Sequence, residues 1–389
     1  MNNKDKIGLT IISFLAYYLT GAMIVVTGVI IRSISEYFKL SIADMSSIFT
    51  FLNAGILVSI FLNSWITKLI SLKKQIICGL GLIIISIIGF IKVHNILIFC
   101  INIFLLGMVG GITMSIGTFL ITNIYFGKER TSKLLITDSF FSMSGIIFPI
   151  ISAFLLKNNI LWYWIYFIIG IIYAIIFIIT LNVKFPIYQL ESYITDTSSK
   201  KNYRISIFML CCSALCYILG QLIFISWIPE YARQNIGMNI QSASHLVSNF
   251  WLSYMVGMWC FSYIIKFIDL QIALTILSGI STLLMYYFIH NHNIHLFNII
   301  MIALGFFSSA IYTIIITLTS LQTKTPSQKL INLILICGTV GTLLTFIITG
   351  PIVFKIGIRG ALIIANILYS TVFILSVLLG FTSKHKINF

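Results

Sequence analysis

The sequence predicts an all-α membrane protein in which twelve transmembrane helices form two pseudo-symmetric six-helix bundles. The prediction rests on the composition, on the number of apolar runs and on a repeat between the two halves of the chain. Of the 389 residues, 59% are hydrophobic and only 8% are charged. A water-soluble protein needs far more polar residues to cover its surface, so this composition excludes a soluble enzyme.

Twelve apolar runs are each long enough to cross the bilayer, because a transmembrane helix needs about 20 residues. The first six lie at residues 8–31, 45–67, 75–92, 96–126, 134–156 and 160–183, and the second six at 205–229, 243–266, 270–290, 296–320, 330–354 and 358–381. A long polar stretch separates the two sets. We therefore expect an N-terminal bundle over residues 1–183, a central cytoplasmic loop over 184–204 and a C-terminal bundle over 205–389.

A repeat relates the two halves at an offset of 198 residues. This offset carries Lys68 to Lys266 and Gly107 to Gly305, and the stretches ITKLISLK and IIKFIDLQ share four of eight residues. Matches of Lys and Gly at the ends of spans are evidence for a repeat, whereas matches of Leu or Ile are expected by chance in a chain so rich in both. Internal repeats of this kind are typical of membrane transporter folds.

The basic residues indicate how the chain is oriented. The formal net charge is +15, but the 24 Lys and Arg residues are scattered through short breaks between apolar runs rather than gathered on one face. This pattern is not that of a nucleic-acid-binding protein. If the N-terminus is cytoplasmic, 17 of them fall on the cytoplasmic side and 7 on the outer side. The positive-inside rule therefore predicts that both termini are cytoplasmic.

Six stretches of the sequence carry a family resemblance. They are TFLNAGILVSIFLNSW (50–65), GGITMSIGTFLIT (110–122), TDSFFSMSGIIFP (137–149), LCYILGQLIFISWIPEYA (215–232), VSNFWLSYMVGMW (247–259) and LGFFSSAIYTIIITL (304–318). They closely resemble the TsgA family of the major facilitator superfamily, a class of secondary transporters, and together they sample essentially the whole chain. The resemblance implies a carrier of the bacterial inner membrane that works by alternating access, but it brings no established substrate.

The sequence departs from two patterns of related carriers. The loop between spans two and three of the superfamily usually has a Gly, an Asp and a basic cluster, and here only the basic part survives, at residues 68–74. Lys68 and Lys266, with nearby carboxylates, are therefore our candidates for a cytoplasmic gate. The chain is also distantly similar to the sugar–proton symporters of the fucose-permease group. Thr27 and Met114 occupy the positions of that group's key carboxylates, so its proton chemistry does not carry over.

Asp138 is the only carboxylate placed well within a predicted span. An ionisable group in a membrane span is costly and must pair, titrate or face water, which makes it a functional candidate by default. Ser142 lies one helical turn further along the same face. We assign both residues to coupling if the carrier uses protons. The alternative is a structural ion pair of Asp138 with Lys133, Lys266 or Arg130.

The resemblance implies that spans one, four, seven and ten line a central cavity, and most polar side chains there are uncharged. The candidate substrate-binding residues on these spans are Tyr18, Thr27, Thr113, Thr118, Tyr217, Gln221 and Tyr312. On span eight, Asn249, Trp251 and Tyr254 could stack against a ring-bearing solute. Hydrogen bonding between helices is the alternative role for Tyr217 and Gln221, and packing is the alternative for Trp251.

These observations predict a secondary active transporter of a small organic solute, with protons as the candidate coupling ion. The alternative is a transporter-derived sensor that binds a solute without moving it. We expect a monomer in the inner membrane, whose partners are the lipid bilayer and the solute, with no nucleic acid and no cofactor. The cysteines of span seven have no further ligands in sequence register, so no metal site is predicted.

Overall fold

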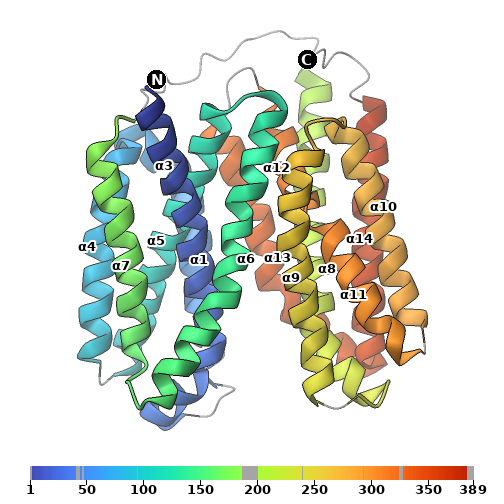
Figure 1. Ribbon diagram of the computed structural model, residues 1–389, viewed down its shortest axis with the longest axis horizontal. Helices are drawn as coiled ribbons and strands as arrows, with labels where there is room; N and C mark the ends of the chain where they lie inside the picture. The colour runs from blue at the N-terminus through green and yellow to red at the C-terminus, as the bar shows by residue number, and fades with distance from the viewer. Residues whose placement is uncertain are drawn as a thin grey trace. The chain divides into compact units, whose positions relative to one another are not determined.

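The computed structural model describes residues 2–40, 44–45, 48–93, 95–185, 200–238, 240–291, 293–323 and 327–382, and within these ranges every long element is a helix (Figure 1). The chain divides into two compact units. Residues 1–124 and 137–191 form unit 1, and residues 125–136 and 192–389 form unit 2. The bundle boundaries expected from the sequence stay a prediction, and the first turns of the helix at 127–157 group with unit 2.

The helices of the first half of the chain are α1 (Asn3–Phe38), α3 (Thr50–Leu69), α4 (Leu72–Ile91), α5 (Ile96–Ile124), α6 (Gly127–Lys157) and α7 (Tyr163–Asn182). Those of the second half are α8 (Lys200–Gln234), α9 (Ile240–Ile264), α10 (Leu270–His290), α11 (Ile294–Ser308), α12 (Ile311–Ser320), α13 (Gln328–Ile356) and α14 (Ile358–Thr382). Within the described residues, eleven of the expected spans each fall mainly on one helix, and the tenth falls on two. The all-α fold is therefore confirmed.

The tenth span differs from the expectation of one continuous helix over 296–320, because it consists of two helices, α11 and α12. The break falls at Ser309 and Ala310. The hydroxyl of Ser308 donates to the carbonyl of Leu304 at 2.6 Å, and that of Ser309 donates to the carbonyl of Phe306 at 2.7 Å. Serine hydroxyls that bond back to helix carbonyls compete with the backbone ladder, and consecutive small residues are common places for a helix to kink.

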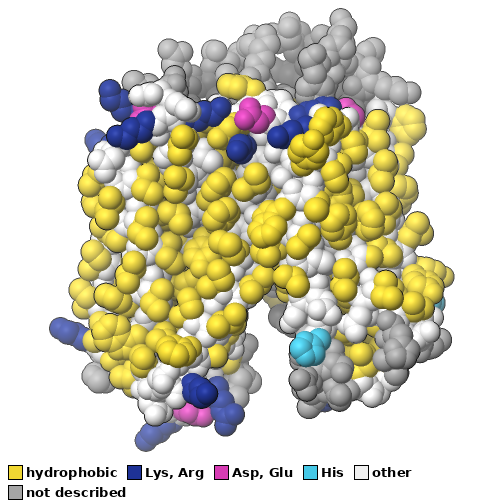
Figure 2. Space-filling model, viewed as in Figure 1, with side chains coloured by type: hydrophobic (Ala, Val, Ile, Leu, Met, Phe, Trp, Pro, Cys, Tyr) yellow, Lys and Arg dark blue, Asp and Glu magenta, His cyan; other side chains and the backbone are white. Residues whose placement is uncertain are grey.

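The outer faces of the helices are apolar, as a lipid environment requires. In α7, Phe167, Ile171, Ile175 and Ile178 are exposed at helical spacing, while the opposite face is buried. On the visible face in Figure 2, hydrophobic side chains cover the middle of each unit, and the charged side chains lie near the helix ends. In the described part of the chain, eleven stretches of helix are long and apolar enough to span a membrane. The remaining expected span, α9, is long enough but more polar.

Close packing of small residues holds corresponding helices together in the two units. The pairs α3–α5 and α9–α11 are in extensive contact. A side chain at Gly107 would overlap with the carbonyl oxygen of Leu52, and one at Gly305 would overlap with the carbonyl of Phe250. Both residues of the second contact lie 198 positions after those of the first. The repeat seen in the sequence is thus a repeat of close helix packing.

A second contact repeats in the same two helix pairs with its residues exchanged. Gly111 of α5 packs against the hydroxyl of Ser59 on α3, whereas Ser309 at the end of α11 packs its hydroxyl against Gly257 of α9. Each position is again 198 residues from its counterpart. In both units one glycine and one serine face each other between the two helices, which lets their backbones approach closely.

Candidate functional site

A cluster of tyrosines in unit 2 surrounds the break in the tenth span. Tyr217 of α8 is fully buried, and its hydroxyl donates to the carbonyl oxygen of Ser308 at 2.7 Å. The hydroxyl of Tyr254 on α9 lies 3.4 Å from that of Tyr217. The ring of Tyr369 on α14 packs against that of Tyr217, with the ring centres 5.4 Å apart. Three side chains from three helices therefore meet where the regular helix ends, and broken helices often mark binding sites in transporters.

Aromatic rings extend this tyrosine cluster. The ring of Tyr312 on α12 is nearly parallel to that of Tyr217, with the ring centres 6.4 Å apart and an interplanar angle of 13°. Trp251 contacts Tyr254 edge-on, with the ring centres 5.6 Å apart. The structure thus brings together four of the residues predicted from the sequence: Tyr217, Tyr254, Trp251 and Tyr312. Tyr369 was not predicted, because the expectation considered only spans one, four, seven, eight and ten.

Gln221 lies one turn beyond Tyr217 on α8 and is only 4% exposed. Its amide nitrogen is buried and has no hydrogen-bond partner among the described residues. Buried polar groups are nearly always satisfied, so an open donor of this kind indicates a missing water or ligand. Asn249 behaves differently, because its amide donates to Asn298 of α11 at 3.2 Å in an exposed position.

In unit 1, polar side chains gather around Tyr17. The hydroxyl of Tyr17 lies 2.7 Å from that of Thr118, and both residues are buried. Asp138 of α6 is close enough to Tyr17 to act on it electrostatically, and Ser142 is buried one turn further along α6. The structure therefore brings Asp138 and Thr118 to one tyrosine, and that tyrosine is the neighbour of the predicted Tyr18.

Tyr18 is half-buried and packs against Phe148 with ring centres 5.8 Å apart. A signal for Tyr17 was present in the sequence. Ser13 and Thr20 share its helix face and are buried with it, and small or polar residues at this spacing mark the inner face of a membrane helix.

The remaining threonines of unit 1 lie outside this group. Thr113 donates to the carbonyl of Val109 at 2.6 Å, within its own helix. Tyr173 of α7 donates to the carbonyl of Ile76 on α4 at 2.9 Å, so this bond joins α7 to α4. Thr27 is half-buried and donates to its own helix at Ile24.

Arg130, near the start of α6, is only 4% exposed. Its guanidinium donates to the hydroxyl of Ser320 at 2.9 Å and to the carbonyl of Tyr125 at 3.1 Å. Ser320 is the last residue of α12, where the helix dipole is negative and favours a cation. In the described part of the chain, Arg130 forms no ion pair with a carboxylate.

The two candidate gate lysines occupy matching positions. Lys68 is exposed in the last turn of α3, and Lys266 is exposed two residues after α9 ends. The ammonium of Lys266 lies 5.9 Å from the ring centre of Tyr263. Among the described residues neither lysine forms an ion pair. Their role in a gate stays a prediction.

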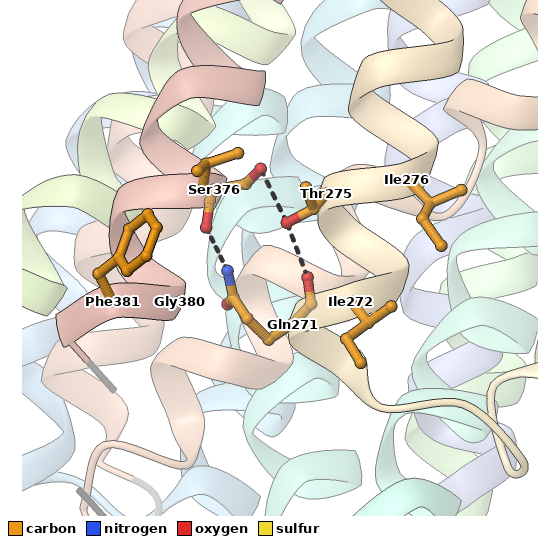
Figure 3. Close-up of a pocket in the computed structure, with 8 residues that line it drawn as sticks. Gln271, Ile272, Thr275, Ile276, Ser376, Gly380 and Phe381 are labelled. Atoms are coloured by element: carbon orange, nitrogen blue, oxygen red, sulfur yellow. Dashed lines mark hydrogen bonds between the residues drawn. The ribbon is translucent and has the colours of Figure 1, made fainter. Parts of the chain in front are cut away.

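A separate pocket of about 330 Å³ opens between α10 and α14 (Figure 3). Gln271 donates its side-chain amide to the carbonyl of Ser376, and the hydroxyl of Ser376 donates to Thr275 at 3.2 Å. The other lining residues are mostly apolar, and Ile272 and Phe381 are more than half exposed. None of the predicted site residues lines this pocket, and its open apolar rim is typical of a lipid-facing groove.

Comparison with known proteins decides the family. A family model described as Major Facilitator Superfamily matches residues 9–329. A "Protein TsgA homolog" from Buchnera aphidicola subsp. Schizaphis graminum (strain Sg) is 58% identical over 386 residues, which cover 99% of both chains. The chain belongs to the TsgA family of the major facilitator superfamily. This TsgA-family chain is also 54% identical to a TsgA homolog from Yersinia pseudotuberculosis serotype O:1b (strain IP 31758), over 99% of this chain and 98% of the relative.

Solved structures of other proteins have the same fold as this TsgA-family chain. The E. coli fucose:proton symporter has a TM-score of 0.78 at 15% identity, over 96% of this chain and 99% of that chain. A bacterial homologue of the iron transporter ferroportin, in an outward-facing state, has a TM-score of 0.73 at 12% identity, over 97% and 100%. Such low identities establish the fold alone. The chain is thus a multi-pass membrane protein of a transporter superfamily.

Proposed function

We propose that this TsgA-family transporter moves a small, uncharged organic solute across the bacterial inner membrane by alternating access. The observation that supports this proposal is the buried amide nitrogen of Gln221, a hydrogen-bond donor without a partner among the described residues, one turn from the tyrosine cluster. A solute-binding site needs polar groups that can hydrogen-bond the solute and that have no hydrogen-bond partner within the protein. Gln221 meets that requirement, and it lies one helical turn along α8 from Tyr217, which bonds Ser308 at the break between α11 and α12.

The chemistry of these residues favours a neutral solute with a ring and hydroxyl groups. Tyr217, Tyr254 and Tyr312 offer hydroxyls and ring faces, and Trp251 offers a flat apolar surface. Few precisely placed polar groups among aromatic side chains are typical of small-molecule sites. The structural neighbour that is a fucose:proton symporter carries a sugar, which agrees with this class of solute. Asn249, Tyr18, Thr27, Thr113 and Thr118 stay secondary candidates.

Asp138 is the proposed coupling group, and protons are the proposed coupling ion. The proposal is supported by the electrostatic influence of Asp138 on Tyr17, whose hydroxyl forms a pair with that of Thr118 that could relay a proton. Ser142 extends the polar face of α6 by one turn. The competing role is a structural ion pair with Lys133. Lys266 and Arg130 are the other candidate partners for this ion pair.

The solute is identified by uptake of a panel of radiolabelled neutral and charged solutes into proteoliposomes, with and without a proton gradient. We expect one class of neutral hydroxylated solute to accumulate only when protein is present. Binding of that solute without uptake or exchange would contradict transport and support a sensor. Uptake confined to charged solutes would contradict the assignment of the tyrosine cluster.

The coupling role of Asp138 is tested by Asp138→Asn. The amide keeps the shape of the side chain but cannot carry a proton, so we expect solute exchange to persist and gradient-driven accumulation to be lost. Glu36→Gln is the control, because Glu36 is an exposed carboxylate near the C-terminal end of α1, where it pairs with Arg32. Full accumulation by Asp138→Asn would refute the role. Loss of expression together with loss of exchange would support the ion pair with Lys133 instead.

A further inference from the structure

Arg130 is a buried cation of unit 2 without a carboxylate partner among the described residues. It lies near the start of α6 and is only 4% exposed. Its neighbour in the chain, Glu129, is exposed, and no described carboxylate lies within ion-pair distance of the Arg130 guanidinium. Arginine is rarely buried unless it is paired, because burying an uncompensated charge is costly. An anion bound at Arg130 would supply that compensation.

The guanidinium of Arg130 lies at the N-terminal end of α6. Its Nε donates to the carbonyl of Tyr125, two residues before the helix begins at Gly127. The ammonium of Lys133 lies 5.5 Å from the ring centre of Tyr125, so a second cation is close to the same segment. The start of a helix acts as about half a positive charge, and the end of α12 at Ser320 acts as about half a negative charge. These two helix ends offset each other and leave the charge of Arg130 uncompensated.

Three hydrogen-bond donors in this part of unit 2 have no acceptor among the described residues. Arg130 uses Nε for Tyr125 and Nη1 for Ser320, and its other terminal nitrogen, Nη2, makes no such bond. Thr131 is fully buried, and its hydroxyl has no partner. The hydroxyl of Thr323, three residues after Ser320, is also buried without a partner. Buried polar groups are nearly always satisfied, so open donors next to a buried cation indicate an acceptor with negative charge.

We propose that Arg130 binds a phosphate group at this end of unit 2, with Thr131 and Thr323 as further hydrogen-bond donors. The planar guanidinium fits phosphate oxygens, and the N–H groups at the start of a helix favour the same ligand. The phosphate belongs either to the headgroup of an acidic phospholipid or to a free phosphate ion. The predicted orientation puts this end of α6 on the cytoplasmic side, where acidic phospholipids are found. The proposal does not depend on the solute or on its transport.

The test is binding of radiolabelled inorganic phosphate and of phosphatidylglycerol to the purified full-length protein in a non-ionic detergent at constant ionic strength. Chloride and diacylglycerol, which lack phosphate, are the control ligands. The wild-type protein should bind at least one of the two phosphate ligands above its control. Phosphatidylglycerol that binds and displaces inorganic phosphate identifies the lipid headgroup as a ligand. Inorganic phosphate that phosphatidylglycerol does not displace identifies the free ion.

Thr131→Val separates ligand binding from folding, because valine keeps the shape of threonine without the hydroxyl. That hydroxyl has no described partner, so without phosphate the variant should unfold at the wild-type temperature or above it. It should bind the phosphate ligand about tenfold more weakly, as expected for one lost hydrogen bond. Thr317→Val is the matched control, because Thr317 is equally buried in α12 and its hydroxyl already donates to the carbonyl of Thr313 at 2.9 Å. Its phosphate binding should equal that of the wild type.

Arg130→Gln tests the charge, because glutamine can donate hydrogen bonds but carries no positive charge. It should weaken binding by about 100-fold, since a hydrogen bond to a charged group is roughly twice as strong as a neutral one. Equal phosphate binding by the wild type, Thr131→Val and Arg130→Gln would overturn the proposal. So would a wild-type protein that binds neither phosphate nor phosphatidylglycerol above the control ligands.

Discussion

Replacing Gly107 by alanine tests whether close approach of α3 and α5 holds the first bundle together. The added methyl group would overlap with the backbone carbonyl of Leu52, which cannot rotate away as a side chain could. Overpacking of this kind costs about 1–3 kcal/mol, whereas replacing glycine by alanine in a helix gains about 0.5–1 kcal/mol. We therefore expect Gly107→Ala to lower the free energy of unfolding by up to about 2 kcal/mol.

Gly81 provides the matched control, because it lies in the interior of α4 with nothing within 4 Å of the added methyl group. Gly81→Ala should gain the helix preference without the clash and be stabilised by about 0.5–1 kcal/mol. Gly305→Ala, at the repeat-related position, should behave like Gly107→Ala because of the carbonyl of Phe250. The assay is thermal unfolding of the purified variants in detergent. Equal stability of Gly107→Ala and Gly81→Ala would refute the packing argument.

Three further predictions follow from the same structure. Tyr217→Phe removes the donor to the Ser308 carbonyl and should cost about 1–2 kcal/mol in thermal unfolding, whereas Tyr287→Phe, at an exposed position, should cost little. Ser320→Ala leaves a buried N–H of Arg130 without its acceptor and should cost about 1–3 kcal/mol in the same assay, and a value near zero would contradict the contact. Fusions at the C-terminus should fluoresce with green fluorescent protein and be inactive with alkaline phosphatase, and the reverse result would overturn the predicted orientation.

Most of the fold could be predicted because membrane spans are set by length and apolarity, which the sequence states directly. The run at 270–290, for example, coincides with α10. The break in the tenth span could not be predicted, because Ser308 and Ser309 look like ordinary small residues in an apolar run. Their effect depends on which carbonyls their hydroxyls reach and on the tight contact of Ser309 with Gly257.

The candidate site could be predicted only in part, because the sequence indicates the type of a residue more reliably than its direction. Tyr217 and Tyr254 were chosen from their spans and lie together, whereas Tyr18 packs against Phe148 and its neighbour Tyr17 contacts Thr118. Neighbours on a helix point about 100° apart, so an error of one residue changes the partner.

The most direct test of the account is counterflow of the identified solute in proteoliposomes containing Gln221→Leu, measured beside thermal unfolding of the same protein. The buried amide nitrogen of Gln221 has no partner among the described residues, so leucine should leave stability unchanged or raise it. If the amide bonds the solute, its loss should lower exchange at limiting solute by about tenfold, the equivalent of one hydrogen bond of about 1.4 kcal/mol. Unchanged exchange by a stable Gln221→Leu protein would contradict a solute site beside the tyrosine cluster.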